Sequence, residues 1–268
     1  MSGRGSLPLV VLAVSGVAPA LSAQAPPPMV TDRPDQTESA QLVGGGFFQL
    51  EVGASHVFER EGSTAATRFQ NVGGALLRIG VFEPAELRLG FAGWQRSSTD
   101  GGTPASGFGD LTVGTKVRLA RGEGLSPAIA LLGGVLIPIG DEDFRAGGVD
   151  PTVRVALAHD LGGGFGLGYN AGAVWIAATD ANGDETTETG LIYSIAFGRE
   201  LLPKLAAFIE AFGVQGVAGD AGSWVALDGG VTVPLRVNFQ LDVSGGVGLS
   251  AGAANWFVSA GFAVRVPR

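Results

Sequence analysis

The 268-residue sequence predicts an all-β protein: an up-and-down antiparallel transmembrane β-barrel of about twelve strands that closes on itself. Three observations predict this fold. Hydrophobic residues recur at every second position along most of the chain, which is the period of a β-strand. The segments with this pattern are about 10–15 residues long, which suits strands that cross a bilayer at a tilt. The connections between these segments alternate between long and short, as in barrels with two unlike ends.

The first 25 residues are expected to form a signal peptide. Arg4 precedes an apolar stretch, LPLVVLAVSGVAPALSA, that ends in small residues. A positive residue, an apolar core and a small-x-small cleavage site are the features of a secretory signal. Cleavage after Ser22 and cleavage after Ala25 both fit this rule. The alternative, a transmembrane anchor, is disfavoured by Pro19 and by the short length of the apolar span.

A charged leader, residues 26–46, follows the signal peptide and precedes the barrel, residues 47–268. Its segment TDRPDQTES, at 31–39, carries Asp32, Arg33, Asp35 and Glu38, and Pro34 interrupts any helix through it. A periplasmic leader of this kind has two interpretations. It can fold into the barrel lumen and pair with charges on the wall, as a plug or constriction. It can also be a solvated tether, because terminal segments are mobile unless they are tied down.

The strand pattern is clearest near the end of the chain. In LRVNFQLDVSG, apolar Phe239 and Leu241 alternate with polar Gln240 and Asp242. In a strand, alternate residues point to opposite faces of the sheet, so each such segment has one apolar and one polar face. The expected strands are 47–58, 69–82, 85–97, 107–121, 126–139, 151–161, 164–177, 187–199, 203–217, 222–233, 235–249 and 255–266.

The connections predict which end of the barrel is which. Odd-numbered connections, such as EREGSTAAT and GDEDFRAGGVD, are mostly long and polar, whereas even-numbered ones, such as EP and GG, are short. Outer-membrane barrels have short periplasmic turns and longer outer loops. An even number of strands then returns both chain ends to the periplasm.

The four tryptophans fall near the predicted outer rim. They are Trp94, Trp175, Trp224 and Trp256. Amphipathic indole rings gather at the headgroup level of membranes, so this placement predicts a partial aromatic girdle. By strand parity, Trp175 and Trp256 face the apolar side and the other two do not. Scattered packing tryptophans are the alternative interpretation.

The composition indicates that the apolar faces point outward to lipid. A soluble barrel would place its apolar face in the core and its charges in water. Here only 16% of the residues are charged, which is too few for a solvated outer wall. The chain also has 45 glycines, and many fall on the polar faces, which suits a wall around a confined lumen. Because hydrocarbon does not tolerate open sheet edges, the sheet is expected to close.

Several function classes are disfavoured by the sequence. The net charge of −8 argues against a nucleic-acid partner, because phosphate binding needs a basic surface. There is no cysteine, and the two histidines, His56 and His159, are far apart, so no metal site is expected. The acidic stretch DANGDE departs from the residue order of a calcium loop. We expect no catalytic residues and no cofactor.

Five stretches carry a resemblance to a known family. They are TDRPDQTES, GFFQLEVGASH, GFGDLTVGTKVRL, SPAIALLGGVLIPIGD and the terminal NWFVSAGFAVRV. Together they resemble a family of bacterial outer-membrane β-barrels labelled transporter, or MetA-pathway of phenol degradation. The resemblance covers nearly the whole mature chain. It implies an exported barrel near twelve strands that passes small solutes, aromatic or hydrophobic ones among them, and it implies the barrel-assembly machinery as a partner.

Charged residues with lumen parity are the candidate site residues. Such a mixed, mildly basic wall could steer anions or bind the acidic residues of the leader. Alternatively, these groups pair with one another and fill a narrow interior. The lumen candidates are Glu51, Arg78, Arg88, Lys116, Arg118, Arg154, Glu210, Asp228, Arg236, Asp242 and Arg265.

The sequence therefore predicts a barrel of the bacterial outer membrane that conducts small solutes passively, with membrane lipid and a small-molecule solute as its partners. A structural or adhesive barrel with a filled lumen, acting through its outer loops, is the first alternative. A soluble exported β-protein is the second. Conductance separates the first two hypotheses, and cell fractionation separates the third.

Overall fold

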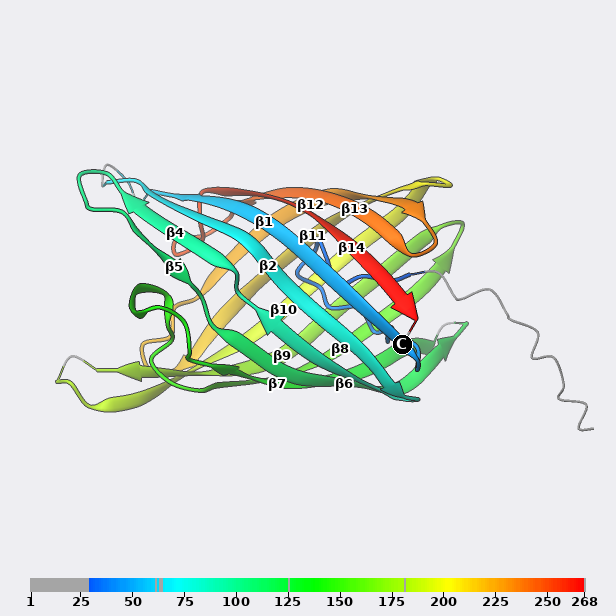
Figure 1. Ribbon diagram of the computed structural model, residues 1–268, viewed down its shortest axis with the longest axis horizontal. Helices are drawn as coiled ribbons and strands as arrows, with labels where there is room; N and C mark the ends of the chain where they lie inside the picture. Colours follow the sequence, from blue (N-terminus) through cyan, green and yellow to red (C-terminus); the bar gives the residue numbers. More distant parts are fainter. Residues whose placement is uncertain (1–28, 61, 63–64, 125, 181, 268) are drawn as a thin grey trace, which may run out of the picture.

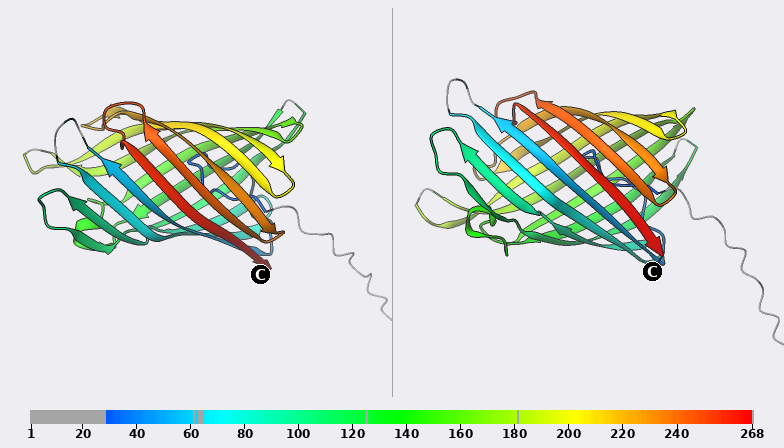
Figure 2. Two further views of the ribbon diagram at one scale, coloured as in Figure 1. Left: turned by 90° about the horizontal axis from the view of Figure 1, so that it is seen from above. Right: turned by 45° about the horizontal axis from the view of Figure 1, so that its top comes forward.

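The fold is all-β. The computed structural model describes residues 29–60, 62, 65–124, 126–180 and 182–267, so the predicted signal peptide, 1–25, lies outside the described residues. Their strand segments form one antiparallel sheet, and β1 pairs with β14 as well as with β2, which closes the sheet into a barrel (Figures 1 and 2). Among the described residues, no helix is long and apolar enough to cross a membrane.

The strand bounds agree closely with the predicted ranges. Within the part of the chain that the structure describes, one 3₁₀ turn, η1 (Glu142–Phe144), interrupts one connection. The strands are β1 (Phe47–Glu59), β2 (Thr67–Phe82), β3 (Ala85–Phe91), β4 (Trp94–Thr99), β5 (Ala105–Phe108), β6 (Leu111–Glu123), β7 (Ser126–Ile137), β8 (Asp150–Gly162), β9 (Phe165–Thr179), β10 (Glu185–Leu202), β11 (Leu205–Ala218), β12 (Trp224–Arg236), β13 (Phe239–Gly248) and β14 (Trp256–Pro267).

Two of the predicted strands are each broken into two segments. β3 and β4 both pair with β2 and together form one barrel strand, and β5 and β6 form the next, so the closed barrel has 12 strands. At the break, Ala92 N–H donates to Asp110 O, and Gly109 N–H donates to Gly93 O, both at 2.9 Å. Gly93 has φ +81°, a conformation that costs glycine little, so the ladder bends here without losing its hydrogen bonds.

The two ends of the barrel differ as predicted. Short turns such as 83–84 and 163–164 lie at the end where the chain reaches its C-terminus, and the longer connections lie at the opposite end (Figure 1). We refer to these as the turn end and the loop end. The buried Asp110 carboxylate accepts hydrogen bonds from Gly140 N–H and Ala146 N–H, both at 2.8 Å, and so ties the long 138–149 connection to the wall.

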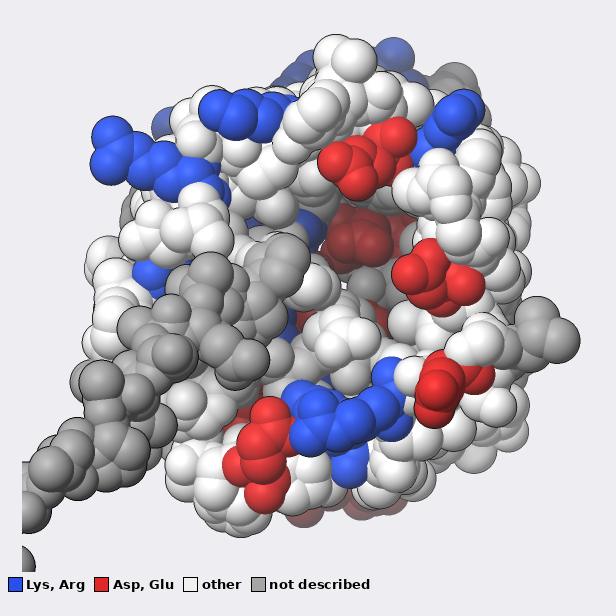
Figure 3. All heavy atoms as spheres, turned by 90° about the vertical axis from the view of Figure 1, so that its right-hand side faces the viewer, with Lys and Arg blue, Asp and Glu red and all other residues white. Residues whose placement is uncertain are grey.

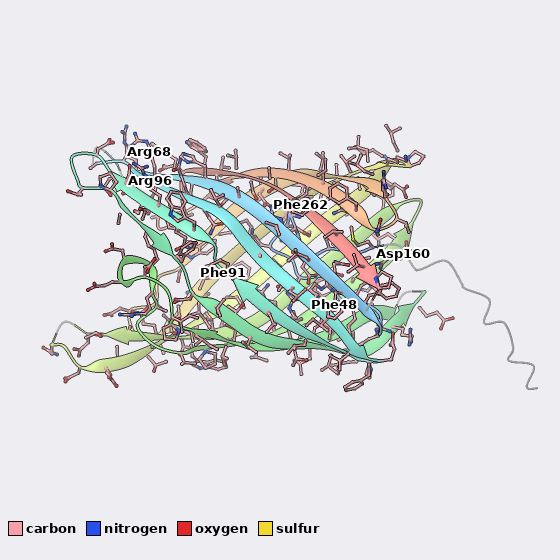
Figure 4. The ribbon with its side chains drawn as sticks, in the orientation of Figure 1. Phe48, Arg68, Phe91, Arg96, Asp160 and Phe262 are labelled. Atoms are coloured by element: carbon pink, nitrogen blue, oxygen red, sulfur yellow. The ribbon has the colours of Figure 1, made fainter. Side chains whose placement is uncertain are left out.

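The apolar faces of the strands point outward, which confirms the predicted inversion of burial. Leu89 is 37% exposed and Val243 is 54% exposed, whereas their neighbours Arg88 and Asp242 are buried. The buried hydrophobic residues are almost all alanines, so the barrel has no large apolar centre. Figure 4 shows Phe91 and Phe262 on the wall away from both ends, with Arg68 and Arg96 at the loop end. Lipid is the solvent that suits such an outer surface.

Three of the four tryptophans follow the predicted facing, and Trp94 does not. Trp94 pairs directly with Val72 and Phe108, which are both exposed, so it shares the outer face of the sheet. Trp175 and Trp256 are exposed on the outer surface, and Trp256 stacks on Phe58 with ring centroids 5.6 Å apart. Trp224 instead lines an interior cavity, where its ring meets the edge of Phe212 at 5.7 Å. The aromatic girdle is therefore partial.

A charge introduced at Val243 tests the facing of the wall. Val243 lies in the middle of β13 on the outer surface, so Val243→Lys should lower the free energy of unfolding by about 2–4 kcal/mol, the cost of a lysine at the bilayer midplane. Urea titration of the protein folded into phospholipid vesicles measures this change. Thr103→Lys, at an exposed position of the loop end, is the control and should cost little. An equal and small effect of both substitutions would contradict the outward facing.

Candidate functional site

The leader, residues 29–46, lies inside the barrel. In Figures 1 and 2 its dark blue trace runs within the ring of strands, near the turn end. Gln49 Nε2 donates to Val30 O at 2.8 Å, and Gly46 N–H donates to Gly80 O at 3.2 Å. Both ends of the described leader are thus held near the start of β1, and the segment between them forms a loop that reaches into the lumen.

Three basic residues of the wall bind the leader carboxylates. Lys116 Nζ donates to both oxygens of Asp32, at 3.0 and 2.9 Å, and Arg88 Nη1 donates to Asp32 Oδ2 at 2.5 Å. Arg78 Nη1 lies 3.2 Å from the same oxygen. Arg88 Nη2 also donates to the two oxygens of Glu38, at 3.0 and 2.8 Å. We call these five residues the basic anchor.

Two further carboxylates of the wall contact the basic anchor and also hold the leader backbone. Glu86 accepts from Arg78 Nε at 2.9 Å and from Val43 N–H at 2.6 Å. Glu51 accepts from Arg78 Nη1 at 3.2 Å and from Asp32 N–H at 3.0 Å. Such groups are stable in a buried site only because each charge has several partners, since an uncompensated buried charge costs about 3–5 kcal/mol.

Strand register explains why the basic anchor needs the leader. Arg78 and Arg88 face each other directly across β2 and β3, and like charges in this position destabilise a sheet. Glu86 pairs directly with Lys116 across β3 and β6, but the wall alone leaves the three basic side chains with only two carboxylates. The wall alone therefore carries one excess positive charge, and Asp32 and Glu38 bring two negative charges that contact these basic groups.

The middle of the leader binds the opposite side of the wall. Gln36 N–H donates to Glu210 Oε2 at 2.7 Å, and the Thr37 hydroxyl donates to Glu210 Oε1. Glu38 N–H donates to Asn170 Oδ1 at 2.7 Å, and Asn170 Nδ2 donates back to Glu38 O at 3.0 Å. Buried side chains thus take the place of the sheet partners that a loop in the lumen lacks.

Arg33 reaches a third part of the wall. Its Nη2 donates to Asp242 Oδ1 at 3.0 Å and to Ser259 Oγ at 2.9 Å. Gly53 and Gly261 lie against its guanidinium, and a Cβ at either position would collide with it. Glycine in these strands therefore makes room for the leader.

A small apolar cluster packs the end of the leader. Ala40 is buried among Ala128, Ala130 and Leu132 of β7 and Ala156 of β8. The polar contacts hold residues 31–39, and this cluster holds the next turn of the leader. The polar contacts thus hold the leader to several sides of the wall, and the apolar cluster holds it to β7 and β8.

Cavities remain on both sides of the leader. Toward the loop end there are cavities of about 640 and 570 Å³, and toward the turn end there are cavities of about 300 and 350 Å³. Arg33, Pro34 and Asp35 line both the 640 Å³ and the 300 Å³ cavity. These three leader residues therefore lie between a space that faces the loop end and a space that faces the turn end.

The structure places most of the predicted lumen candidates inside the barrel. Arg154 is half-buried and donates to Gln36 O at 3.2 Å, and Arg265 is buried beside the Phe47 ring, at 5.3 Å from its centroid. Arg118, whose side chain is 11% exposed, pairs with Glu83 of the β2–β3 turn at 2.9 Å, and its register partner is the buried Ala130. One candidate differs from the prediction: Arg236 is exposed at the turn end of β12. The remaining candidates are buried: Glu51, Arg78, Arg88, Lys116, Glu210, Asp228 and Asp242.

Sequence reasoning missed Glu86 and the uncharged polar residues of the wall. Glu86 shares its facing with Arg88, two positions later, so strand parity alone would have found it. Gln49, Asn170 and Gln240 are also buried and bind the leader, but an amide gives no distinctive signal in a sequence.

No metal centre emerges from the described residues, in which no group of three His, Cys, Asp or Glu side chains could hold a metal ion. His159 Nε2 lies 3.1 Å from the hydroxyl of Tyr169. The acidic loop at 180–185 is organised by its own backbone: Asp180 Oδ1 accepts from Asp184 N–H at 2.9 Å and from Asn182 N–H at 2.8 Å. These hydrogen bonds hold the pKa of Asp180 below its usual value.

Comparison with known proteins identifies a family. Residues 31–266 match the family described as "Putative MetA-pathway of phenol degradation". The match begins at the first residue of the TDRPDQTES segment, so it includes the part of the leader that lies in the lumen. A search of curated proteins finds no match.

Solved structures with the same fold are barrels of the outer membrane. The NanC porin shares 11% identity over 82% of this chain and 99% of that chain, with a TM-score of 0.50. The translocator domain of the autotransporter NalP from Neisseria meningitidis shares 12% identity over 84% and 90%, with a TM-score of 0.53. The β domain of the Bordetella autotransporter BrkA shares 14% over 83% and 99%, with a TM-score of 0.53. Identities this low establish the fold alone.

Removing the leader carboxylates should release the leader from the wall. The chain has no cysteine, so Ala40→Cys provides a single reporter at a buried leader position. Adding Asp32→Asn and Glu38→Gln should raise the rate of maleimide labelling roughly ten-fold or more, since breaking buried ion pairs costs about 3–5 kcal/mol. Asp100→Asn, which breaks exposed pairs with Arg60 and Arg68, is the matched control. Equal labelling rates in all three proteins would contradict anchoring by the carboxylates.

Proposed function

We propose a function from one premise: the chain belongs to the family described as "Putative MetA-pathway of phenol degradation". The protein is an outer-membrane barrel with a porin-like role in transport, and we infer that it conducts small solutes passively through its lumen, with the leader as the constriction. The observation that carries this proposal is the pair of interior spaces separated by Arg33, Pro34 and Asp35. A lumen packed solid would leave no such spaces.

Aromatic or hydrophobic solutes are the class that we propose. The 640 Å³ cavity is lined by the rings of Phe212, Trp224 and Phe257, which meet edge to face at centroid distances of 5.7 and 6.0 Å. Polar groups of Arg33 and Ser244 line the same cavity. Ligand pockets typically combine a mainly apolar lining with a few polar groups that orient the ligand. The family description, which names phenol degradation, supports the same class.

We also propose how the protein reaches its membrane and which membrane this is. Export through the predicted signal peptide and insertion by the barrel-assembly machinery would place the barrel in the outer membrane, in contact with its lipid. Its porin-like neighbours and its family support a role in transport rather than catalysis. Flux then follows the concentration gradient of the solute.

A structural or adhesive barrel is the second candidate, and one observation favours it. The buried ion pairs of the basic anchor and the alanine cluster occupy the lumen beside β2, β3 and β6–β8. If the leader never moves, only the outer loops are available to act. Electrical recording distinguishes the two candidates, because a filled barrel carries no current.

Deletion of residues 31–39 should raise the single-channel conductance in planar bilayers roughly two-fold or more, because it removes the constriction from the lumen. The unaltered protein should show discrete openings of smaller size. Deletion of 219–222, in a connection at the loop end, is the control and should leave the conductance nearly unchanged. A silent membrane with both the unaltered and the 31–39 deletion proteins would favour the filled barrel, and an unchanged current would make the leader a tether.

A further inference from the structure

An acidic patch lies on the wall beside the leader turn at 33–37. Glu210 and Asp228 are directly opposite each other across β11 and β12, and Asp242 follows on the next strand, β13. All three are buried. We call these three residues the acidic wall. Asp35, at the tip of the leader turn, is half-buried beside them and adds a fourth carboxylate.

The acidic wall is not neutralised as the basic anchor is. Arg33 pairs with Asp242, but it uses only one of the two oxygens, and Asp242 Oδ2 has no hydrogen-bond partner among the described residues. Asp228 is 4% exposed, and within the same part of the chain no N–H or hydroxyl donor reaches its oxygens, which contact only the opposite carboxyl group of Glu210. The hydroxyl of nearby Ser244 also lacks one. Buried acceptors without donors are costly, so this patch is suited to a group that brings donors or positive charge.

The position of the acidic wall connects it with the interior spaces. Arg33 and Asp35 line both the 640 Å³ cavity toward the loop end and the 300 Å³ cavity toward the turn end. Ser244 lines the first of these cavities, and Gln240, also on β13, lines the second. Figure 3 looks into the turn end and shows acidic atoms deep within the hollow. A solute that passes from one cavity to the other must therefore pass Asp35, which lies beside the acidic wall, although the acidic-wall carboxylates themselves line neither cavity.

The leader is held more weakly on this side than on the side of the basic anchor. At the basic anchor, Asp32 and Glu38 make several charge-assisted contacts with Arg78, Arg88 and Lys116. On this side the leader makes one ion pair, Arg33 with Asp242, and donates to Glu210 from one backbone N–H and one hydroxyl. Because fewer ion pairs hold it than hold the basic anchor, the turn at 33–37 is the part of the leader that can move aside at least cost.

We propose that the conducting path runs past Asp35 of the leader turn, within the field of the acidic wall, and that this path favours cations and ammonium-bearing solutes over anions. This inference rests on the proposed function of passive conduction. Rings of carboxylates select cations in narrow pores, where the low dielectric of the wall strengthens their field. Even when the closely spaced Glu210 and Asp228 share one proton, the pair retains one negative charge.

The charge of the path is the reverse of what the sequence indicates. Counting lumen residues suggested a mildly basic wall that could steer anions. In the structure, the charges of Arg78, Arg88 and Lys116 are paired with Asp32, Glu38, Glu51 and Glu86, on the side that the leader covers. Two charged residues line both cavities: Arg33, which is paired with Asp242, and Asp35, which lies beside the acidic wall.

Reversal potentials in planar bilayers test the proposal. The mature protein is recorded across a gradient of KCl and then of choline chloride, and the unaltered channel should show a potential of the sign that marks cation preference. The double variant Glu210→Gln and Asp228→Asn should lower the ratio of cation to chloride permeability about three-fold or more, because it removes the wall carboxylates. Asp35→Asn, which alters only the leader, should lower the ratio in the same direction even if the double variant fails to fold. Glu123→Gln, at an exposed position at the turn end, is the matched control and should leave the ratio unchanged.

The outcomes separate this inference from the proposed function. Channels that prefer chloride, or a ratio that neither Asp35→Asn nor the double variant changes, would overturn the acidic path and leave passive conduction standing. The absence of channels in both the unaltered and the 31–39 deletion proteins would overturn passive conduction and, with it, the path. Cation preference that falls in the acidic-wall variants but not in Glu123→Gln supports the inference.

Discussion

The leader neutralises three buried basic side chains of the barrel wall, and this interaction holds the leader in the lumen. Arg78 and Arg88 face each other across two strands, with Lys116 on the third, in an interior where an unpaired charge is strongly disfavoured. Glu51 and Glu86 compensate for two of the charges, and Asp32 inserts its carboxylate among all three basic groups. The barrel wall and the leader are therefore mutually dependent. Wall side chains accept hydrogen bonds from the leader backbone, and the leader carboxylates compensate for the excess positive charge of the wall.

Small residues make this arrangement possible. A Cβ on Gly53 or Gly261 would collide with Arg33, and one on Gly80 would collide with the leader backbone at Gly44. The high glycine content thus has a specific physical role, because it widens the lumen where the chain must pass through it. The same feature explains why the apolar packing inside the barrel consists of alanines around Ala40. Stability must then come mainly from the closed hydrogen-bonded sheet and from the outward apolar faces in lipid.

Much of this architecture could be predicted from local patterns. The period of two predicts which residues face outward. This prediction was correct for Leu89, which is exposed where Arg88 is buried, and for Leu241, which is exposed where Asp242 is buried. The break at Gly93 could not be foreseen, because a bulge depends on the register of the neighbouring strand. The partners of Asp32 were equally hidden, since they come from three strands whose alignment is a long-range property. The prediction for Arg236 was wrong because strand parity does not show where a strand leaves the barrel. The acidic path could be inferred only from the ion pairs of the structure, which show which charged side chains already have a partner.

The leader is bound to a basic side of the lumen, borders an acidic side and lies between two interior spaces. The central claim is that the leader lies in the lumen of the folded protein in its membrane. Thr37 Oγ1 and Ser194 Oγ are 2.8 Å apart, whereas Ile195, the next residue, faces outward and is 51% exposed. The most direct measurement is disulfide formation in isolated outer membranes, read from the shift in mobility on a non-reducing gel. The account predicts that Thr37→Cys with Ser194→Cys forms a crosslink and that Thr37→Cys with Ile195→Cys does not. Failure of the first pair to crosslink, or equal crosslinking of both pairs, would contradict it.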